Sequence, residues 1–429
     1  MNLNLNTINS VHFIGIGGIG VSAIAHLMQL NGKRVSGSDM ADSPVIERLR
    51  NKGIKISIGH NAYNITKETD LVIYSIAVKD TNPEIIEAKE KSITLLSYPQ
   101  ALSSLSKNLQ TIAISGTHGK TTTTAMLANV LMAAQFNPTV IVGSFMKNYD
   151  SNLLVSKSDY FLVEACEYRR SFLNLYPKIL AITNVDEDHL DYYHDIADIQ
   201  SAFRELALRI PKDGLIVCNV DDEKVKPIIS GLQCTVIDYM EFANVDINLQ
   251  FPGEHNRQNA AICVAIAQFL GINKEITYKA LESFSGTWRR FELKGTTNSG
   301  TLIYDDYAHH PKEIESTLSG MKEAHQDKRR VVFFQPHLYS RTKTLLKEFS
   351  KAFTDADEVN ILPIYASRES LDTTINSEIL VKMIGKKAFY IDSFEEAAKK
   401  IEILDNTDAA ILMGAGNIYK LSELVVKAI

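Results

Sequence analysis

The sequence predicts an α/β protein of three consecutive domains with mostly parallel sheets. Its 429 residues exceed the length at which one hydrophobic core stops growing. Apolar, β-branched runs alternate with amphipathic stretches, which is typical of parallel sheets covered by helices. This strand-and-helix pattern begins afresh twice along the chain. We therefore predict domains at residues 1–106, 107–288 and 289–429.

The composition and charge favour a soluble globular protein over a nucleic-acid-binding or zinc-binding one. Apolar residues make up 45% and charged residues 22%, which is ordinary for a soluble globular protein. A net charge of −6 gives no electrostatic reason to expect nucleic acid as a partner. The four cysteines form no C-x-x-C pair, which argues against a zinc site and fits a reducing compartment. With no signal peptide and no long apolar run, we expect a cytoplasmic protein without a membrane segment.

The first domain opens with a glycine turn between a strand and a helix. The turn contains Gly15, Gly17, Gly18 and Gly20, and an acid, Asp39, ends the next strand. This spacing predicts a Rossmann-like domain that binds the pyrophosphate of a nucleotide. A nicotinamide dinucleotide fits the motif taken alone, and the alternative without a ligand is a purely structural turn.

A second glycine loop lies at the start of the central domain. It reads Gly116, Thr117, His118, Gly119, Lys120, Thr121 and Thr122, follows the strand TIAIS and opens a helix. Backbone N–H groups and the helix N-terminus would bind phosphate oxygens there. Lys120 would neutralise the β- and γ-phosphates, and the Thr121 hydroxyl would bind Mg²⁺. We expect a P-loop ATPase domain, the alternative being a glycine turn without a ligand.

Two residues downstream are candidate metal ligands. Glu164 ends the apolar strand FLVE, and His189 follows the next apolar strand. Ligands of such sheets bind at strand ends, so both side chains are expected to face the phosphate loop. A histidine is an unusual ligand for Mg²⁺, which favours oxygen. For Asp188 and Asp191 the alternative is capping of the next helix, which we favour for Asp191.

A set of motifs resembles the Mur ligases over nearly the whole chain. In order, they are GTHGKTTT, EACEYRRSFL, TNVDEDHLDYY, GEHNRQNAA, GTWRRFE, DDYAHHP, FQPHLYSRT and GAGNI. Within the family, HFIGIGGIGVSAIA, VSGSD, EACEYRR and FQPH-x-x-SRT are most similar to the branch that adds L-alanine to UDP-N-acetylmuramate. The third domain is then expected to be Rossmann-like as well.

The resemblance implies an activity and its partners. ATP would phosphorylate the carboxylate of UDP-N-acetylmuramate, and the amine of L-alanine would attack the acyl phosphate to form a new amide bond. The implied cofactors are ATP and two Mg²⁺ ions. We expect a monomer or homodimer that binds neither nucleic acid nor membrane.

The resemblance also implies residue roles. The expected catalytic residues are Lys120, Glu164, His189, His337 and Arg341, and the expected metal ligands are Thr121, Glu164 and His189. Besides the phosphate loop, the nucleotide would contact Asn256, Asn259, Arg290 and Asp306. The sugar nucleotide and amino acid would contact the first glycine turn, Asp39, Ser75, Ala77, Tyr307, His309, His337 and Arg341.

Some of these residues have plainer alternatives. Asn259 would then be the N-cap of a helix, Arg290 a surface ion-pair residue and His337 a strand cap. His310 is expected to have only a structural role. The chain also departs from several Mur ligases, because no lysine lies between His189 and Pro211 to become the carbamylated lysine that bridges metal there.

Three other functions compete with this interpretation. The nearest is a peptidoglycan-recycling ligase that attaches a tripeptide to the same sugar nucleotide. A nicotinamide-dependent oxidoreductase would use the first glycine turn but leaves the phosphate loop unexplained. The third is a non-catalytic, nucleotide-gated binding module.

Overall fold

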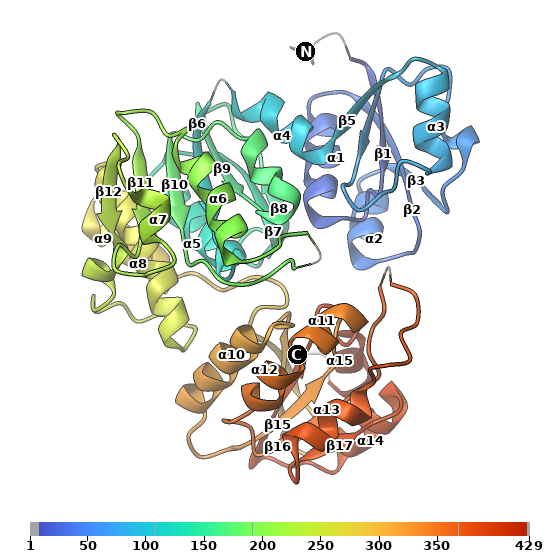
Figure 1. Cartoon of the computed structure of the whole chain (residues 1–429), viewed down its shortest axis with the longest axis vertical. Coiled ribbons are helices and arrows are strands. Elements are labelled where there is room, and N and C mark those ends of the chain that lie inside the picture. Colours follow the sequence, from blue (N-terminus) through green and yellow to red (C-terminus); the bar gives the residue numbers. More distant parts are fainter. Residues whose placement is uncertain (1–7, 108, 191, 368, 427–429) are drawn as a thin grey trace. The chain divides into compact units, whose positions relative to one another are not determined.

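The computed structural model describes residues 8–107, 109–190, 192–367 and 369–426. It confirms the predicted class, because the chain forms three α/β domains around three separate sheets (Figure 1). By contacts, the chain divides into two compact units. One comprises Met1–Val245 and Asn259–Leu281, and the other Asp246–Gln258 and Glu282–Ile429. Within the described ranges, no helix is long and apolar enough to span a bilayer.

The first sheet is fully parallel, in the order β3-β2-β1-β4-β5. Its strands are β1 (Ser10–Ile14), β2 (Arg34–Asp39), β3 (Lys55–Ile58), β4 (Leu71–Tyr74) and β5 (Thr94–Ser97). The helices are α1 (Ile19–Leu30), α2 (Pro44–Asn51), α3 (Pro83–Glu90) and α4 (Tyr98–Ser106), with a 3-10 turn η2 (Ala62–Asn64).

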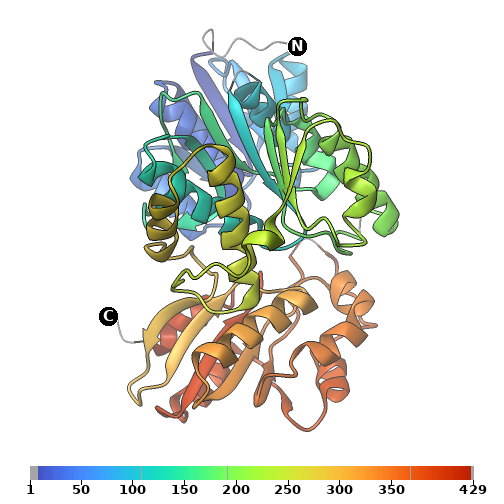
Figure 2. The same cartoon turned by 90° about the vertical axis from the view of Figure 1, so that its left-hand side faces the viewer.

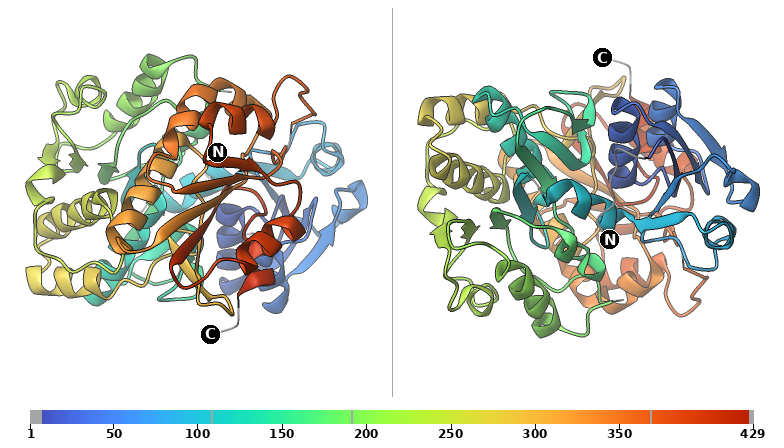
Figure 3. Two further views of the ribbon diagram at one scale, coloured as in Figure 1. Left: turned by 90° about the horizontal axis from the view of Figure 1, so that it is seen from below. Right: turned by 90° about the horizontal axis from the view of Figure 1, so that it is seen from above.

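Alternation along β1 builds two cores, one on each face of the first sheet. Phe13 belongs to the cluster that contains residues of α1 and α4, whereas Ile14 belongs to the cluster that contains Ile85 of α3. The right-hand view of Figure 3 shows these helices beside the strands. The carboxyl ends of the strands therefore remain available for the glycine turn.

The second sheet has the order β12-β11-β10-β6-β9-β7-β8. Its strands are β6 (Gln110–Ser115), β7 (Thr139–Met146), β8 (Ser151–Leu154), β9 (Tyr160–Glu164), β10 (Ile179–Ile182), β11 (Leu215–Cys218) and β12 (Thr235–Asp238). The helices in this part of the chain are α5 (Lys120–Ala133), α6 (Ile196–Ala207), α7 (Lys226–Ile229), α8 (Glu254–Phe269) and α9 (Lys274–Glu282), with 3-10 turns η3 (Tyr168–Asn174) and η4 (Tyr239–Phe242).

The third sheet has the order β13-β14-β18-β15-β16-β17. Its strands are β13 (Glu292–Thr296), β14 (Leu302–Asp306), β15 (Arg329–Phe334), β16 (Glu358–Ile361), β17 (Ala388–Tyr390) and β18 (Asp408–Met413). The helices are α10 (Pro311–Ala324), α11 (Tyr339–Thr344), α12 (Leu346–Ala352), α13 (Ser377–Ile384), α14 (Phe394–Glu402) and α15 (Lys420–Val425). Residues of α10, α12 and α13 pack on one face and residues of α14 and α15 on the other (Figure 2).

Two antiparallel pairings were not predicted. β8 pairs with β7, and β13 pairs with β14, each in antiparallel register at the edge of its sheet. The segments SNLL and ELKGT lack the continuous apolar run of a strand buried on both faces, so their sequences do not stand out.

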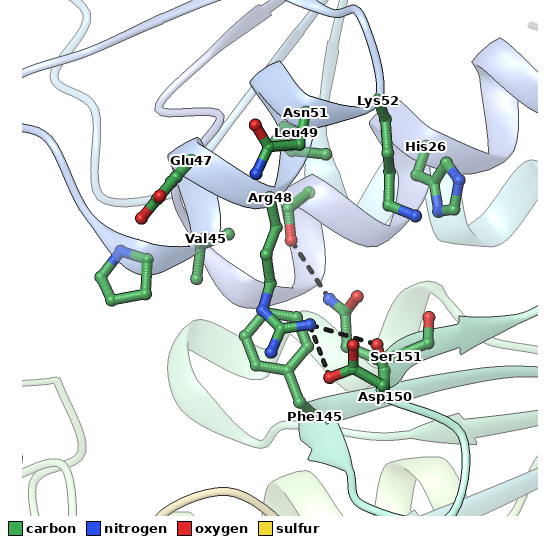
Figure 4. A pocket seen from close by; sticks show the side chains of 13 residues that line it. His26, Val45, Glu47, Arg48, Leu49, Asn51, Lys52, Phe145, Asp150 and Ser151 are labelled. Carbon is green, nitrogen blue, oxygen red and sulfur yellow. Dashed lines mark hydrogen bonds and ion pairs between the residues drawn. The ribbon is translucent and has the colours of Figure 1, made fainter. Parts of the chain in front are cut away.

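Helices α1 and α2 lie against the β7–β8 hairpin around a cavity of about 630 Å³ (Figure 4). Arg48 lies over the ring of Phe145, 4.4 Å from its centre, and pairs with Asp150 at 2.7 Å. Asn152 donates through Nδ2 to the carbonyl of Ile19 at 2.6 Å and to the hydroxyl of Ser22 at 3.1 Å. These contacts join the hairpin to the first domain, and no residue predicted for a functional site lines the cavity.

The two kinds of contact should differ in their contribution to stability. Asn152 is buried, and Asn152→Ala should lower the free energy of unfolding by about 1–2 kcal/mol, because buried polar partners lose a donor. Asp150→Asn in the exposed ion pair should change it by less than about 1 kcal/mol. Urea denaturation of both variants measures the difference; equal losses would contradict the assignment.

Candidate active site

The phosphate loop connects β6 to α5, as predicted. Gly116 and Gly119 have φ angles of 128° and 85°, which only glycine adopts without strain. A Cβ atom on Gly116 would lie 2.0 Å from Oγ1 of Thr183, at the end of the neighbouring strand β10. Both the conformation and the close approach of β10 therefore require glycine.

The segment after β10 fixes the loop through hydrogen bonds that were not predicted. Thr183 donates through Oγ1 to the carbonyl of His118 at 2.5 Å. The side-chain oxygen of Asn184 accepts from the His118 N–H at 2.9 Å, and the backbone carbonyl of Asn184 accepts from the Thr117 N–H at 3.0 Å. Thr183 and Asn184 open the motif TNVDEDH, so position directly after an apolar strand was the available signal.

Lys120 lies inside the loop that it follows. Its Nζ donates to the carbonyls of Gly116 at 2.6 Å and Thr117 at 3.0 Å, and it pairs with Glu167 at 3.0 Å. Burial lowers the pKa of Lys120, but the charges of its neighbours, Glu167 foremost with Cys166 and Glu164, together outweigh burial and raise this pKa overall. Lys120 therefore carries a firm positive charge at the centre of the loop, and Glu167 is a site residue that sequence reasoning missed.

Glu164 ends β9 and faces the start of α5. Its Oε1 accepts from the Thr121 hydroxyl at 3.0 Å, and its Oε2 accepts from the Gly143 N–H at 2.7 Å. A hydroxyl and a carboxylate oxygen at this separation suit Mg²⁺, which takes oxygen ligands and often completes its shell with phosphate and water. In the described ranges, no three His, Cys, Asp or Glu side chains gather to form a metal site of their own.

His189 lies beside Glu167. Its Nε2 is 3.8 Å from Oε1 of Glu167 and 3.8 Å from Oδ2 of Asp188, and its ring packs against Tyr168 at 4.7 Å between centres. The φ angle of His189 is 56°, an unfavourable conformation for this residue. The carboxylates of Glu167 and Asp188 therefore both lie beside this imidazole.

Capping of the next helix by Asp188 is a wrong alternative. Helix α6 begins at Ile196, and its N-cap is Asp195, whose side chain accepts from the Asp198 N–H. Asp188 instead accepts from the N–H of His189 at 2.7 Å. Asp191 lies outside the described residues.

The capping alternative for Asn259 is also wrong, because α8 begins at Glu254 and contains Asn259 in its interior. Its Oδ1 accepts from the Thr123 hydroxyl at 3.0 Å, and a Cβ on Gly119 would lie 2.6 Å from the same atom. Asn259 therefore packs directly against the phosphate loop. Asn256 donates through Nδ2 to the carbonyl of Pro252 at 2.8 Å.

The first glycine turn lies at the carboxyl ends of β1, β2 and β4. The N–H of Gly17 donates to Oδ2 of Asp39 at 2.8 Å, so Asp39 holds the turn itself. A Cβ on Gly15 would lie 3.0 Å from Cβ of Ser75, and the N–H of Ala77 donates to the Ser75 hydroxyl at 3.3 Å. The predicted residues of β1, β2 and β4 are therefore brought together.

Gly18 and Gly20 differ in their surroundings. Gly18 is the N-cap of α1, and Gly20 lies in its first turn. A Cβ on Gly20 would lie 2.4 Å from the hydroxyl of Tyr98, so this glycine serves packing against α4.

In the second compact unit, a polar cluster forms after β14 and β15. The rings of Tyr307 and His309 have centres 5.3 Å apart, and those of His309 and His337 are 6.1 Å apart. Arg341 lies on α11 with Nη1 3.3 Å from Nδ1 of His337, and His337 stacks on Tyr365. The four residues predicted for substrate contact in this domain therefore form one cluster.

Asp306 and His310 have structural contacts. Asp306 accepts from the backbone N–H groups of Phe291 and Ala308, both at 2.7 Å, and burial raises its pKa while Arg290 lowers it. These bonds fix the loop that carries Tyr307. His310 forms the capping box of α10, which confirms its predicted structural role.

Arg289, next to the predicted Arg290, is the buried arginine of this region. It pairs with the fully buried Asp305 at 3.1 Å and donates to the carbonyls of Gly414 and Gly416 at 2.5 and 3.0 Å. Its own carbonyl accepts from the Tyr307 N–H at 2.8 Å. The guanidinium of Arg290 instead lies 5.1 Å from the centre of the Tyr307 ring.

A phosphate loop with a carboxylate beside its threonine, in a chain of three α/β domains, defines an enzyme class that works on nucleotide phosphates. Three family models match in chain order. They are "Mur ligase family, catalytic domain" at residues 10–109, "Mur ligase middle domain" at 114–243 and "Mur ligase, glutamate ligase domain" at 289–416. The chain belongs to the Mur ligase family.

Curated relatives and a solved structure agree with this membership. A UDP-N-acetylmuramate–L-alanine ligase from Clostridium botulinum (strain Loch Maree / Type A3) is 42% identical over 97% of both chains. The ligase of the same name from Clostridium perfringens (strain 13 / Type A) is 40% identical over 97% of both. The crystal structure of the UDP-N-acetylmuramate–alanine ligase from Thermotoga maritima matches with a TM-score of 0.83 at 30% identity, covering 96% of this chain and 97% of that one.

The two neighbouring arginines should differ sharply when replaced. Arg289→Met should lower the free energy of unfolding by about 3–5 kcal/mol, because it leaves the Asp305 carboxylate buried without its partner. Arg290→Met is the matched control and should cost less than about 1 kcal/mol. Chemical denaturation followed by circular dichroism measures both; similar losses would show that Arg289 does not hold this loop.

Proposed function

We propose that this protein joins L-alanine to UDP-N-acetylmuramate at the expense of ATP, through an acyl phosphate, in the synthesis of peptidoglycan precursor. The observation that carries the proposal is the 42% identity, over 97% of both chains, to curated ligases with this activity. The order and content of the phosphate loop, the metal-binding side chains and the glycine turn support it. We also propose the domain limits 1–106, 107–288 and 289–429.

The phosphate loop supplies the groups that phosphoryl transfer needs. The loop N–H groups and Lys120 would hold the β- and γ-phosphates and neutralise charge as the γ-phosphoryl group moves to the substrate carboxylate. Thr121 and Glu164 would hold Mg²⁺, which supplies further positive charge next to the phosphates. Glu167 and His189 would form a second site, where the absent bridging lysine leaves one anion fewer. Asn256 and Asn259 are proposed for adenine, and Arg290 and Asp306 for ribose and phosphate.

The sugar nucleotide would bind at the first glycine turn, with Asp39, Ser75 and Ala77 around it. One contact supports an approach of its carboxylate toward the phosphate loop. Arg169, five residues beyond Glu164, donates to the carbonyl of Ile76 at 3.2 Å, between Ser75 and Ala77. The segment that follows the metal-binding glutamate therefore reaches the loop that borders the glycine turn.

The amino acid would bind with the cluster of the third domain. Arg341 would hold a carboxylate or the acyl phosphate through paired hydrogen bonds, and His337 would orient its guanidinium. Tyr307 and His309 would border the muramoyl end.

The alternatives have less support. A murein peptide ligase from Psychrobacter arcticus matches with a TM-score of 0.74 at 24% identity, a level at which the likeness concerns the fold. A nicotinamide-dependent oxidoreductase has no use for the phosphate loop. Curated relatives from Clostridium botulinum carry the L-alanine ligase name and match over nearly their whole length.

Phosphate release tests the activity. The protein should release phosphate from ATP when UDP-N-acetylmuramate and L-alanine are both present. Lys120→Ala should lower kcat at least about 100-fold, because the lysine no longer neutralises the negative charge of the phosphoryl group during its transfer. Lys226→Ala, which removes an exposed lysine paired with Glu223, is the control and should leave kcat unchanged. Stimulation by a tripeptide but not by L-alanine would favour the recycling ligase and overturn the proposal.

Metal dependence tests the role of Glu164. Glu164→Gln should raise the Mg²⁺ concentration for half-maximal activity by about tenfold or more, because a neutral amide binds the cation less well than a carboxylate. The exposed Glu187 provides the control Glu187→Gln, for which no change is expected. A Mg²⁺ titration at saturating ATP makes the measurement, and identical curves for wild type and Glu164→Gln would exclude Glu164 as a ligand.

A further inference from the structure

A buried carboxylate lies behind the first glycine turn, in a position that neither the motifs nor the proposed mechanism uses. Glu84 lies in the first turn of α3, and its side chain is fully buried. The N-cap Asn82 accepts from the Glu84 N–H at 2.9 Å, which fixes the residue at the start of the helix. A buried charge is costly unless it is fully hydrogen-bonded, so its partners indicate what it does.

Polar groups from three separate segments surround the Glu84 carboxylate. The Ser38 hydroxyl of β2 donates to Oε2 at 2.6 Å, and the Asn64 side chain of η2 donates to Oε1 at 2.6 Å. The N–H of Asn61 donates to Oε1 at 3.1 Å. His12 of β1 lies 3.5 Å away through Nε2.

His60 completes this cluster from its rim. Its Nδ1 is 3.0 Å from the Ser38 hydroxyl and 3.6 Å from Oε2 of Glu84. A hydroxyl has one proton, which Ser38 gives to Glu84, so His60 must donate its Nδ1–H to Ser38. The direction of both bonds is thereby fixed. Although burial raises the pKa of Glu84, the neighbouring His12 side chain and the hydrogen bonds from Asn64 and Ser38 hold it at about 2, so the group is charged at neutral pH.

Ser38 connects this cluster to the glycine turn. Its carbonyl accepts from the N–H of Gly15 at 2.8 Å and from the N–H of Ile16 at 3.0 Å. The next residue, Asp39, accepts from the N–H of Gly17 at 2.8 Å. The end of β2 therefore holds three successive N–H groups of the turn, and Glu84 holds the end of β2.

We propose that Glu84 is a positioning residue that fixes the glycine turn for the sugar nucleotide through the Ser38 hydroxyl. The inference rests on the proposed function, because it takes the turn as the binding site of the UDP moiety. Glu84 does not touch the ligand in this account. A hydrogen bond between a hydroxyl and a buried carboxylate is strong and directional, so its loss lets the end of β2 shift relative to the turn.

Steady-state kinetics of Glu84→Gln test the proposal. The amide keeps the shape but removes the charge, and the KM for UDP-N-acetylmuramate should rise about tenfold, as expected for a hydrogen bond to a charged group. The KM for ATP and kcat should stay within about twofold, because the phosphate loop is untouched. Glu87→Gln is the matched control on the same helix, where Glu87 pairs with Lys91 near the surface, and should change nothing.

Ser38→Ala is the second variant and removes only the connecting hydroxyl, so it keeps the proposal testable if Glu84→Gln does not fold. It should raise the same KM, and adding Glu84→Gln to it should cause little further change, because both act through one bond. Equal increases in the KM for ATP, or fully additive effects, would overturn the proposal. If the wild-type protein does not use UDP-N-acetylmuramate at all, the proposed function fails; normal wild-type turnover with an unaffected Glu84→Gln variant rejects only the role of Glu84.

Discussion

The close approach of β10 to the phosphate loop is the constraint on which the central site depends. Gly116 has room for no side chain, because Thr183 occupies the space that a Cβ would need. This contact lets the residues after β10 bind both the N–H and the carbonyl of His118, so the loop is held in a fixed conformation. Lys120, Thr121 and Glu164 take their positions from this loop, since the first two open the helix that it starts and the third bonds to Thr121.

Several unfavourable backbone conformations lie near residues that are proposed for chemistry. Arg169, Arg170, His189, Arg289 and Leu338 all have positive φ angles, and each lies within a few residues of a proposed site residue. Such conformations cost free energy and persist only where surrounding contacts impose them. For Arg289 these contacts are the bonds of its side chain to Asp305 and to two glycine carbonyls. Its backbone carbonyl also accepts from the N–H of Tyr307. The second compact unit therefore stores conformational strain next to its polar cluster.

Sequence patterns predicted the parallel strands well and the supporting contacts poorly. The apolar runs that end in Glu164 and precede Thr183 stand out because strands buried on both faces need such runs. The edge strands β8 and β13 do not, because half-exposed strands tolerate polar residues. The helix containing Asn259 begins earlier than predicted, since Glu254 and its neighbours are polar yet helical. Glu167 and Glu84 were missed because their importance comes from partners 47 and 46 residues away in the chain, which local patterns do not reveal.

The bond between Arg169 and the carbonyl of Ile76 joins the segment after β9 to the segment after β4 in the first compact unit. Arg169 follows Glu164, the proposed metal ligand, and Ile76 lies between Ser75 and Ala77, which are proposed for the sugar nucleotide. A ligand that orders the chain at one end of this bond lowers the conformational entropy that a second ligand must remove when it binds at the other end. By thermodynamic linkage any such gain in affinity is mutual and equal in both directions. The binding of the two substrates would then be coupled through the guanidinium group of Arg169.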